Sequence, residues 1–218
     1  MEGGTKKRVV LFGLSANPPT GLQGHMGIAK YFSSLFDEVW ILPVYRHAYS
    51  SKRQLESFER RMDMITLALR DCQLDKQNIF LKTYEKDCFY SLYPSVDVAS
   101  REIAFGSIDL VRWLRQQFPE VEFSMIVGED AFIDICNNKW RESDQLRQLI
   151  HFEVLHRQGV PETAIQPASC WYTRHGLALG DVSSTKARNA GEKSELDALV
   201  TPSVSSYIVD NRLYSFRT

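Results

Sequence analysis

Short apolar runs that alternate with helical patterns constrain the fold of this chain more than any other feature. Residues 8–13 (RVVLFG) form a continuous apolar run that ends in glycine, which is typical of a parallel strand buried on both faces. Comparable runs follow at residues 38–44, 79–84, 122–128 and 152–156. Apolar residues at helical spacing lie between the runs, at residues 25–36, 53–69 and 99–117. The alternation predicts an α/β fold with a Rossmann-like doubly wound parallel sheet.

Length and composition predict a single domain over residues 1–218. The chain has 44% hydrophobic and 24% charged residues, as in an ordinary globular protein. We expect residues 1–7 to be flexible and the aromatic stretch 87–97 to be a loop over one end of the sheet. Residues 181–218 are expected to form a short helical C-terminal region, whose last helix begins near Thr201.

The charge balance argues against a nucleic-acid partner. Lys and Arg total 26 and Asp and Glu total 27, so the formal net charge is −1 and no large basic field is present. No segment approaches the ~20 apolar residues of a membrane span, and no signal or transit segment is recognisable. The four cysteines lack metal-ligand spacing and are interpreted as free thiols. We therefore expect a cytoplasmic or nuclear protein without a membrane partner.

A glycine- and proline-rich loop links the first expected strand to the first expected helix. It runs from Gly13 to His25 (GLSANPPTGLQGH), where open α/β sheets bind their ligands. Its glycines allow a ligand to approach the backbone, and Thr20 and His25 offer donors to a phosphate. The loop lacks GxGxxG and the Gly-Lys-Ser/Thr of a P-loop, which argues against a dehydrogenase or a P-loop kinase. The competing interpretation is a surface turn with His25 as a helix cap.

A second candidate anion site lies near the C-terminus. Ser183, Ser184 and Thr185 precede a short helical stretch that carries Lys186 and Arg188. Hydroxyls and amides at a helix start, beside two cations, can bind an anion. Taken alone, the segment is better explained as an ordinary Ser/Thr helix cap with a solvated basic turn.

Together these segments resemble the nicotinamide/nicotinate mononucleotide adenylyltransferase family, part of the nucleotidyltransferase superfamily. Thr20 and His25 resemble the HxGH or TxxH motif of the superfamily, and VSSTKAR resembles its ISSTxIR motif. Further similarity covers most of the chain and lies in SFERRMDMITLAL, SMIVGEDAFIDI, KWRESDQLRQLIHFEVLHRQG and VTPSVSSYIVDNRLY. The last of these segments favours the pyridine-nucleotide branch over the phosphopantetheine and cytidylyl branches.

The sequence also departs from the family pattern. Three residues separate Thr20 from Gly24 where HxGH would have one, and Thr20 replaces the first histidine. Ala187 stands where an aliphatic residue such as isoleucine is usual. Residues 101–111 match the family's aromatic-Thr-x-Asp-Thr-Leu run only loosely, and extra residues at 91–98 precede them. These differences affect the ligand geometry of the loop and the pyridine preference.

The resemblance implies transfer of AMP from ATP to nicotinamide or nicotinate mononucleotide, with release of pyrophosphate. It implies Mg²⁺ carried with ATP as the cofactor, and no dedicated metal ligands. The implied catalytic residues are His25, Thr20, Lys52 and Arg188. The implied ATP-binding residues are Gly13, Leu14, Ser15, Gly24, His25, Gly128, Asp130, Ser183, Ser184, Thr185 and Arg188. The implied mononucleotide-binding residues are Ser15, Asn17, Lys52 and Trp140.

Several alternatives stay open at this point. Trp140 either stacks on the pyridine ring or belongs to the core, and Asp130 either binds a ribose hydroxyl or caps the next helix. The chain could act on another phosphorylated acceptor, or it could be a non-catalytic nucleotide-binding regulator. Neither the choice between the amide and the acid form of the pyridine nor the formation of a homo-oligomer follows from the sequence.

Overall fold

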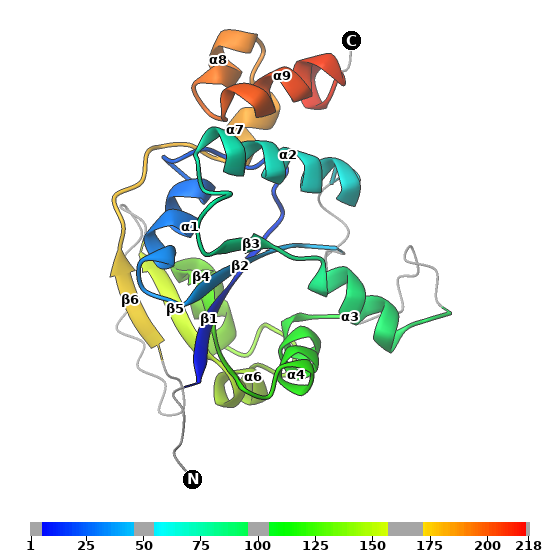
Figure 1. The fold of residues 1–218 in the computed structure, drawn as a ribbon, viewed down its shortest axis with the longest axis vertical. Helices are drawn as coiled ribbons and strands as arrows, with labels where there is room; N and C mark the ends of the chain where they lie inside the picture. The colour runs from blue at the N-terminus through cyan, green and yellow to red at the C-terminus, as the bar shows by residue number, and fades with distance from the viewer. Residues whose placement is uncertain (1–5, 46–54, 96–104, 157–171, 217–218) are drawn as a thin grey trace.

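A six-stranded parallel sheet forms the centre of the computed structural model, which describes residues 6–45, 55–95, 105–156 and 172–216 (Figure 1). The strands are β1 (Lys7–Leu14), β2 (Glu38–Pro43), β3 (Ile79–Leu81), β4 (Val121–Gly128), β5 (His151–His156) and β6 (Tyr172–Gly176). Their order is β3-β2-β1-β4-β5-β6, and each neighbouring pair is parallel. The sheet therefore grows in both directions from β1 and β4, which confirms the predicted doubly wound α/β fold.

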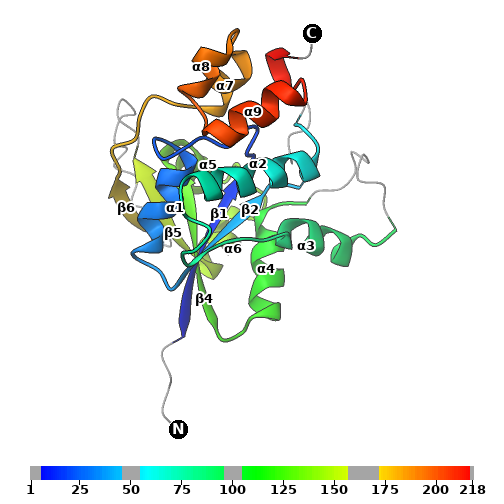
Figure 2. The same ribbon diagram turned by 45° about the horizontal axis from the view of Figure 1, so that its top comes forward.

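Helices pack on both faces of the sheet (Figures 1 and 2). Their bounds are α1 (His25–Ser33), α2 (Phe58–Asp71), α3 (Tyr84–Leu92), α4 (Ser107–Gln117), α5 (Glu129–Cys136), α6 (Ser143–Leu149), α7 (Ser184–Asn189), α8 (Lys193–Asp197), α9 (Pro202–Asp210) and the 3₁₀ turn η1 (Tyr214–Phe216). None of the helices in the described ranges is long and apolar enough to cross a membrane.

The apolar run of β1 supplies two cores because successive strand residues point to opposite faces of the sheet. Val10 and Phe12 join the core shared with α1, α2 and the C-terminal helices α7 to α9. Val9 and Leu11 join the core shared with α3, α4, α5 and α6. This arrangement fixes the direction of β1 and of α1, and hence the place of the loop that connects them.

Several helix boundaries differ from the predicted ones. α1 ends at Ser33, before residue 36, and α4 begins at Ser107. The predicted starts of two helices, at residues 53 and 99, lie outside the described residues. α2 begins after Ser57, whose side chain accepts the N–H of Arg60 and so satisfies one of the helix's first donors. The last helix, α9, begins after Thr201 as predicted.

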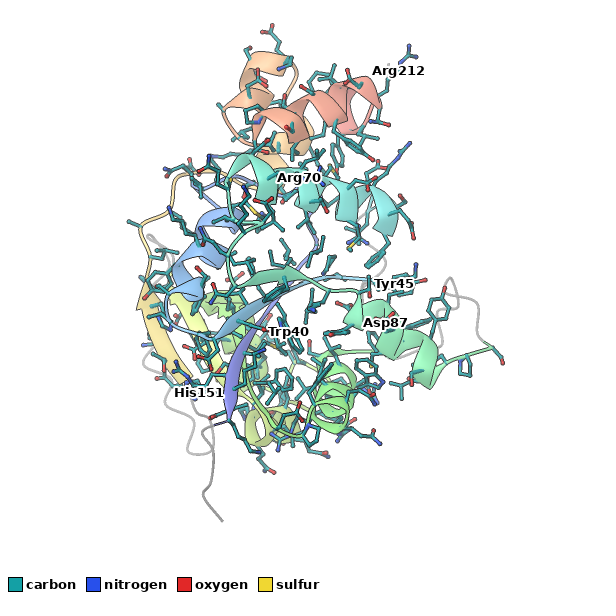
Figure 3. The ribbon with its side chains drawn as sticks, in the orientation of Figure 1. Trp40, Tyr45, Arg70, Asp87, His151 and Arg212 are labelled. Carbon is teal, nitrogen blue, oxygen red and sulfur yellow. The ribbon has the colours of Figure 1, made fainter. Side chains whose placement is uncertain are left out.

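The predicted strand 79–84 and the predicted loop 87–97 are both partly wrong, because α3 takes residues from each. β3 ends at Leu81 and α3 begins at Tyr84. The ring of Tyr84 packs edge-on against Trp40 of β2, with 5.1 Å between their centroids (Figure 3 labels Trp40). α3 buries two of its nine residues, so its apolar positions give little helical periodicity.

The edge strand β6 was absent from the prediction because its sequence, YTRHG, contains no apolar run. Polar contacts tie it to the rest of the fold. The Nε2 atom of buried His175 lies 2.6 Å from Oε2 of Glu153 in β5, and its Nδ1 atom lies 3.0 Å from the hydroxyl of Tyr31 in α1. A strand attached in this way carries no hydrophobic alternation that a sequence pattern could report.

Candidate active site

The glycine- and proline-rich loop lies beyond the carboxyl end of β1. Residues 15–24 connect Leu14, the last residue of β1, to His25, the first residue of α1. β4 pairs with β1 in parallel and ends at Gly128, so both strands end at the same edge of the sheet. In open α/β sheets this switch point forms the crevice that binds ligands. The loop therefore occupies the place that its sequence predicts.

Thr20 and His25 are in direct contact at the start of α1. The backbone N–H of Thr20 donates to Nδ1 of His25 over 3.0 Å, and the Thr20 hydroxyl lies 2.9 Å from the same nitrogen. The backbone N–H of His25 donates in turn to Oγ1 of Thr20 over 2.9 Å. Because Nδ1 accepts the Thr20 N–H, a neutral His25 ring carries its proton on Nε2, from which it can donate to a phosphate oxygen. Thr20, which is 1% exposed, thus orients His25.

The three residues between Thr20 and Gly24 fit into a tight turn. The N–H of Gly24 donates to the carbonyl of Gly21 over 2.9 Å. A Cβ atom on Gly24 would lie 2.2 Å from Oγ1 of Thr20, so glycine is required there for Thr20 to reach His25. The departure from the HxGH spacing therefore keeps the two predicted residues together.

The second predicted cluster meets this loop across the fold. The hydroxyl of Ser184 donates to the carbonyl of Pro18 over 2.7 Å, and Nη1 of Arg188 donates to the carbonyl of Asn17 over 2.7 Å. Figure 2 shows the blue segment after β1 close to α7 and α9. The two motifs are more than 160 residues apart in the sequence, and the structure brings them together.

The helix-cap interpretation also holds for part of the second cluster. The side chain of Ser183 accepts the N–H of Lys186 over 3.2 Å at the start of α7. Lys186 pairs with Asp181, and Nη2 of Arg188 donates to Oγ1 of Thr185 over 3.1 Å. Ser183 therefore caps the helix, whereas Ser184 and Arg188 contact the loop.

Arg61 is a residue of the site that the sequence analysis missed. It lies on α2 and is 1% exposed. Its Nη1 donates to the carbonyl of Ser15 and its Nε to the carbonyl of Glu56, each over 3.0 Å. Burial lowers the pKa of Arg61 below its usual value, and the nearby acid Glu85 offsets only part of this shift. One signal was available, because Arg61 occupies the helical spacing of the apolar residues Phe58 and Ile65 in SFERRMDMI.

Replacing Arg61 by methionine is expected to destabilise the protein by about 3 kcal/mol, because a buried and a partly buried carbonyl lose charged donors. The melting temperature should then fall by about 6–12 °C in a chain of this length. The matched control is Arg70→Met on the same helix, where the side chain is exposed (Figure 3). Equal melting temperatures for the two variants, measured by calorimetry, would show that Arg61 does not anchor the loop.

The remaining predicted residues lie around the same edge of the sheet or outside the described ranges. Gly13 is in β1 opposite Leu42, and Leu14 is 6% exposed. Gly128 is the N-cap of α5, and Asp130 is exposed in the first turn of that helix, so Asp130 is not the cap.

Two further predicted residues complete the set. Trp140 is half-buried and packs against the edge of the core of α3 to α6, and a role against the pyridine ring stays a prediction. Lys52 lies outside the described residues, and its role also stays a prediction.

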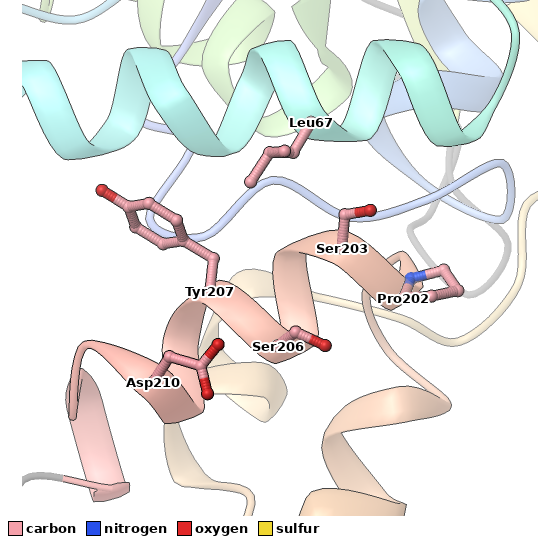
Figure 4. A pocket seen from close by; sticks show the side chains of 6 residues that line it. All are labelled: Leu67, Pro202, Ser203, Ser206, Tyr207 and Asp210. Carbon is pink, nitrogen blue, oxygen red and sulfur yellow. The ribbon is translucent and has the colours of Figure 1, made fainter.

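Two hollows on the described surface lie away from the loop. One, of about 390 Å³, is a shallow groove between α2 and α9, lined by Leu67, Pro202, Ser203, Ser206, Tyr207 and Asp210 (Figure 4). The other, of about 640 Å³, lies at the amino ends of β4 and β5 and includes Lys6, Arg115 and His151. Neither hollow contains a residue of the two motifs.

Comparison with known proteins identifies the family. Residues 12–190 match the model of the cytidylyltransferase-like family. The chain belongs to the cytidylyltransferase-like family. A probable nicotinate-nucleotide adenylyltransferase of Myxococcus xanthus is 26% identical to this family member over 213 residues, 96% of each chain. A protein of the same name from Shouchella clausii is 29% identical over 211 residues, 95% of this chain and 97% of its own.

A solved structure agrees with the fold of this cytidylyltransferase-like chain. It is the nicotinic acid mononucleotide adenylyltransferase of Plasmodium falciparum complexed with NaAD. The TM-score is 0.76 at 21% sequence identity, and the match covers 96% of this chain and 98% of the other. Family and relatives confirm the predicted resemblance to pyridine mononucleotide adenylyltransferases, and the chain is a nucleotidyltransferase.

Proposed function

We propose that the protein transfers the adenylyl group of ATP to nicotinate mononucleotide and releases pyrophosphate, with deamido-NAD as the second product. The observation that carries the proposal is the meeting of the Thr20–His25 loop with Ser184 and Arg188 at the switch point of the sheet. The names of the relatives support the nicotinate form of the acceptor.

The reaction proposed here needs no protein nucleophile. An oxygen of the 5′-phosphate of the mononucleotide forms a bond to the α-phosphorus of ATP, and the bond from that phosphorus to the bridging oxygen breaks. The electron pair leaves with pyrophosphate. Because charge accumulates on the phosphate oxygens as this bond breaks, fixed donors and cations accelerate the reaction by stabilising that charge.

The geometry supports distinct roles for the two motifs. His25 donates from Nε2 to a phosphate of ATP, because its Nδ1 atom is engaged by Thr20. Arg188, Ser184 and Thr185 face the β- and γ-phosphates, and their hydroxyl and guanidinium groups supply further donors. Lys52 is proposed as an additional phosphate contact.

The other predicted contacts complete the two substrate sites. Gly13, Leu14, Ser15, Gly24, Gly128, Asp130 and Ser183 are proposed to surround ATP. Ser15, Asn17 and Trp140 are proposed to contact the mononucleotide, with the flat face of the Trp140 ring suited to a pyridine.

We propose that Mg²⁺ enters with ATP. No group of three or more metal-ligating His, Cys, Asp or Glu side chains gathers within the described residues. Phosphate oxygens and water suit this hard cation, and the ion would neutralise charge on the leaving pyrophosphate.

An acceptor panel tests the proposal. Purified protein is incubated with ATP and one of nicotinate mononucleotide, nicotinamide mononucleotide, phosphopantetheine or a sugar phosphate, with and without MgCl₂, and pyrophosphate release is measured. We expect kcat/KM to be highest for nicotinate mononucleotide, by about tenfold or more over the amide, because the relatives are named for the acid form and a site suited to a charged carboxylate discriminates against the neutral amide.

The other results of the panel separate the alternatives. If kcat/KM is higher with phosphopantetheine or a sugar phosphate than with nicotinate mononucleotide, that compound is the acceptor and the proposed one is wrong. Binding of ATP in calorimetry without pyrophosphate release for any acceptor would indicate a nucleotide-binding regulator.

A further inference from the structure

Asn17 is the residue on which three distant segments meet. It is 1% exposed, and its side-chain oxygen Oδ1 accepts the hydroxyl of Tyr214 over 2.8 Å and the N–H of Glu56 over 3.2 Å. Its backbone carbonyl accepts Nη1 of Arg188 over 2.7 Å. We call Asn17, Glu56, Arg61, Arg188 and Tyr214 the Asn17 clasp. Within it, Arg61 connects the carbonyls of Glu56 and Ser15 and so closes a ring around the first half of the loop.

Tyr214, which makes this contact, has an unfavourable backbone conformation. Its φ angle is +55°, in the left-handed region that non-glycine residues seldom adopt. The preceding residue, Leu213, is fully buried, and its N–H donates to the carbonyl of Ile208 at the end of α9. A structured C-terminal segment therefore positions the hydroxyl of Tyr214 beside Asn17.

The Tyr214 hydroxyl is the hydrogen-bond donor in its contact with Asn17. Burial raises the pKa of its phenol, although the charges of Arg188 and Arg61 lower it. A phenylalanine would keep the ring and lose the donor, so the hydrogen bond to Asn17 can be removed alone.

We propose that Tyr214 is a positioning residue of the transfer reaction, which holds the phosphate loop in place through Asn17. The inference rests on the proposed function. Asn17 is three residues before Thr20, which orients His25, and its carbonyl directs Arg188. The Tyr214 hydroxyl thus influences both the Thr20–His25 loop and Arg188 through Asn17. Within the described residues, its hydrogen bond is to Asn17 and to no phosphate-binding side chain of either motif.

This role predicts a particular kinetic signature. Tyr214 positions protein groups and does not bind substrate. Its loss therefore leaves the phosphate-binding side chains present but positions them less firmly. Misplacement affects the transition state more than the ground state, and kcat should fall more than KM rises.

Tyr207 provides a matched control. It lies on α9, seven residues before Tyr214, and its hydroxyl donates to Oδ2 of Asp63 in α2 over 3.0 Å. Figure 4 shows its ring extending from α9 toward α2, beside Leu67. Tyr207→Phe and Tyr214→Phe each remove one hydroxyl contact of the C-terminal region, and only Tyr214 contacts the loop.

Steady-state kinetics with ATP and nicotinate mononucleotide test the inference. We expect Tyr214→Phe to lower kcat about fivefold or more, with each KM within about twofold of the parent, and Tyr207→Phe to keep kcat within about twofold. Equal kcat values for the two variants would overturn the proposal, as would a rise in KM that accounts for the whole loss in Tyr214→Phe.

Hydrogen exchange distinguishes a failure of this inference from a failure of the proposed function. Amide exchange of residues 15–25 is measured by mass spectrometry in the parent protein and both variants, without substrate. We expect faster exchange of this segment in Tyr214→Phe alone, whichever acceptor the enzyme uses. Unchanged exchange in Tyr214→Phe would overturn the proposal even if the parent makes deamido-NAD.

Discussion

Replacing His25 by alanine is expected to lower kcat about a hundredfold, the equivalent of about 3 kcal/mol of transition-state stabilisation. The reason is the loss of the Nε2 donor to a phosphate that gains negative charge during the transfer. The half-exposed ring adds little to the core, so we expect the variant to fold. Pyrophosphate release with ATP and nicotinate mononucleotide gives the rate, and a parental rate in His25→Ala would disprove the role of His25.

Two further substitutions separate the two nitrogens of the ring. An asparagine at position 25 has an oxygen near the place of Nδ1 and can still accept the Thr20 N–H, but it has no donor at the place of Nε2. A glutamine reaches farther and can offer an N–H there. We therefore expect His25→Gln to retain more activity than His25→Asn, whereas the reverse order would indicate that the Thr20 contact, and not the outer donor, is what catalysis requires.

The sequence contains most of what determines the sheet. β1, β2, β4 and β5 lie between helices and read as apolar runs, because strands buried on both faces need no polar residues. The edge strand β6 and the helix α3 escape this pattern because few of their side chains are buried and apolar, and β6 is joined to its neighbours by polar contacts such as that of His175 with Glu153. Polar contacts between individual side chains give no repeating hydrophobic pattern in the sequence.

The candidate site divides in the same way. The loop with Thr20 and His25 and the segment with Ser184 and Arg188 are recognisable because each is contiguous in the sequence. The Asn17 clasp is not contiguous, since Tyr214 and Asn17 are 197 residues apart and meet only in the folded chain. The sequence therefore predicts groups that can contact phosphate, and the structure is needed to show what holds those groups in place.

Replacing Gly24 by alanine is expected to reduce kcat about tenfold to a hundredfold, because a misplacement of about 1 Å in a reacting group can cost that much. The added Cβ would lie 2.2 Å from Oγ1 of Thr20 and 3.0 Å from Cγ2 of Val182, so the turn must move. The control is Gly176→Ala at the end of β6, where a Cβ meets no atom within 4 Å. Kinetics of both variants provide the comparison, and a parental kcat in Gly24→Ala would contradict the tight fit.

A double variant shows whether Gly24 acts through His25. If the alanine at position 24 lowers the rate by displacing Thr20 and the ring that Thr20 orients, then most of its effect disappears once the ring is gone. We expect kcat of His25→Ala with Gly24→Ala to lie within about threefold of His25→Ala alone, because residues that act as a unit are not additive. Losses that multiply would instead assign Gly24 a separate contact with the nucleotide, through close approach of its backbone to a phosphate.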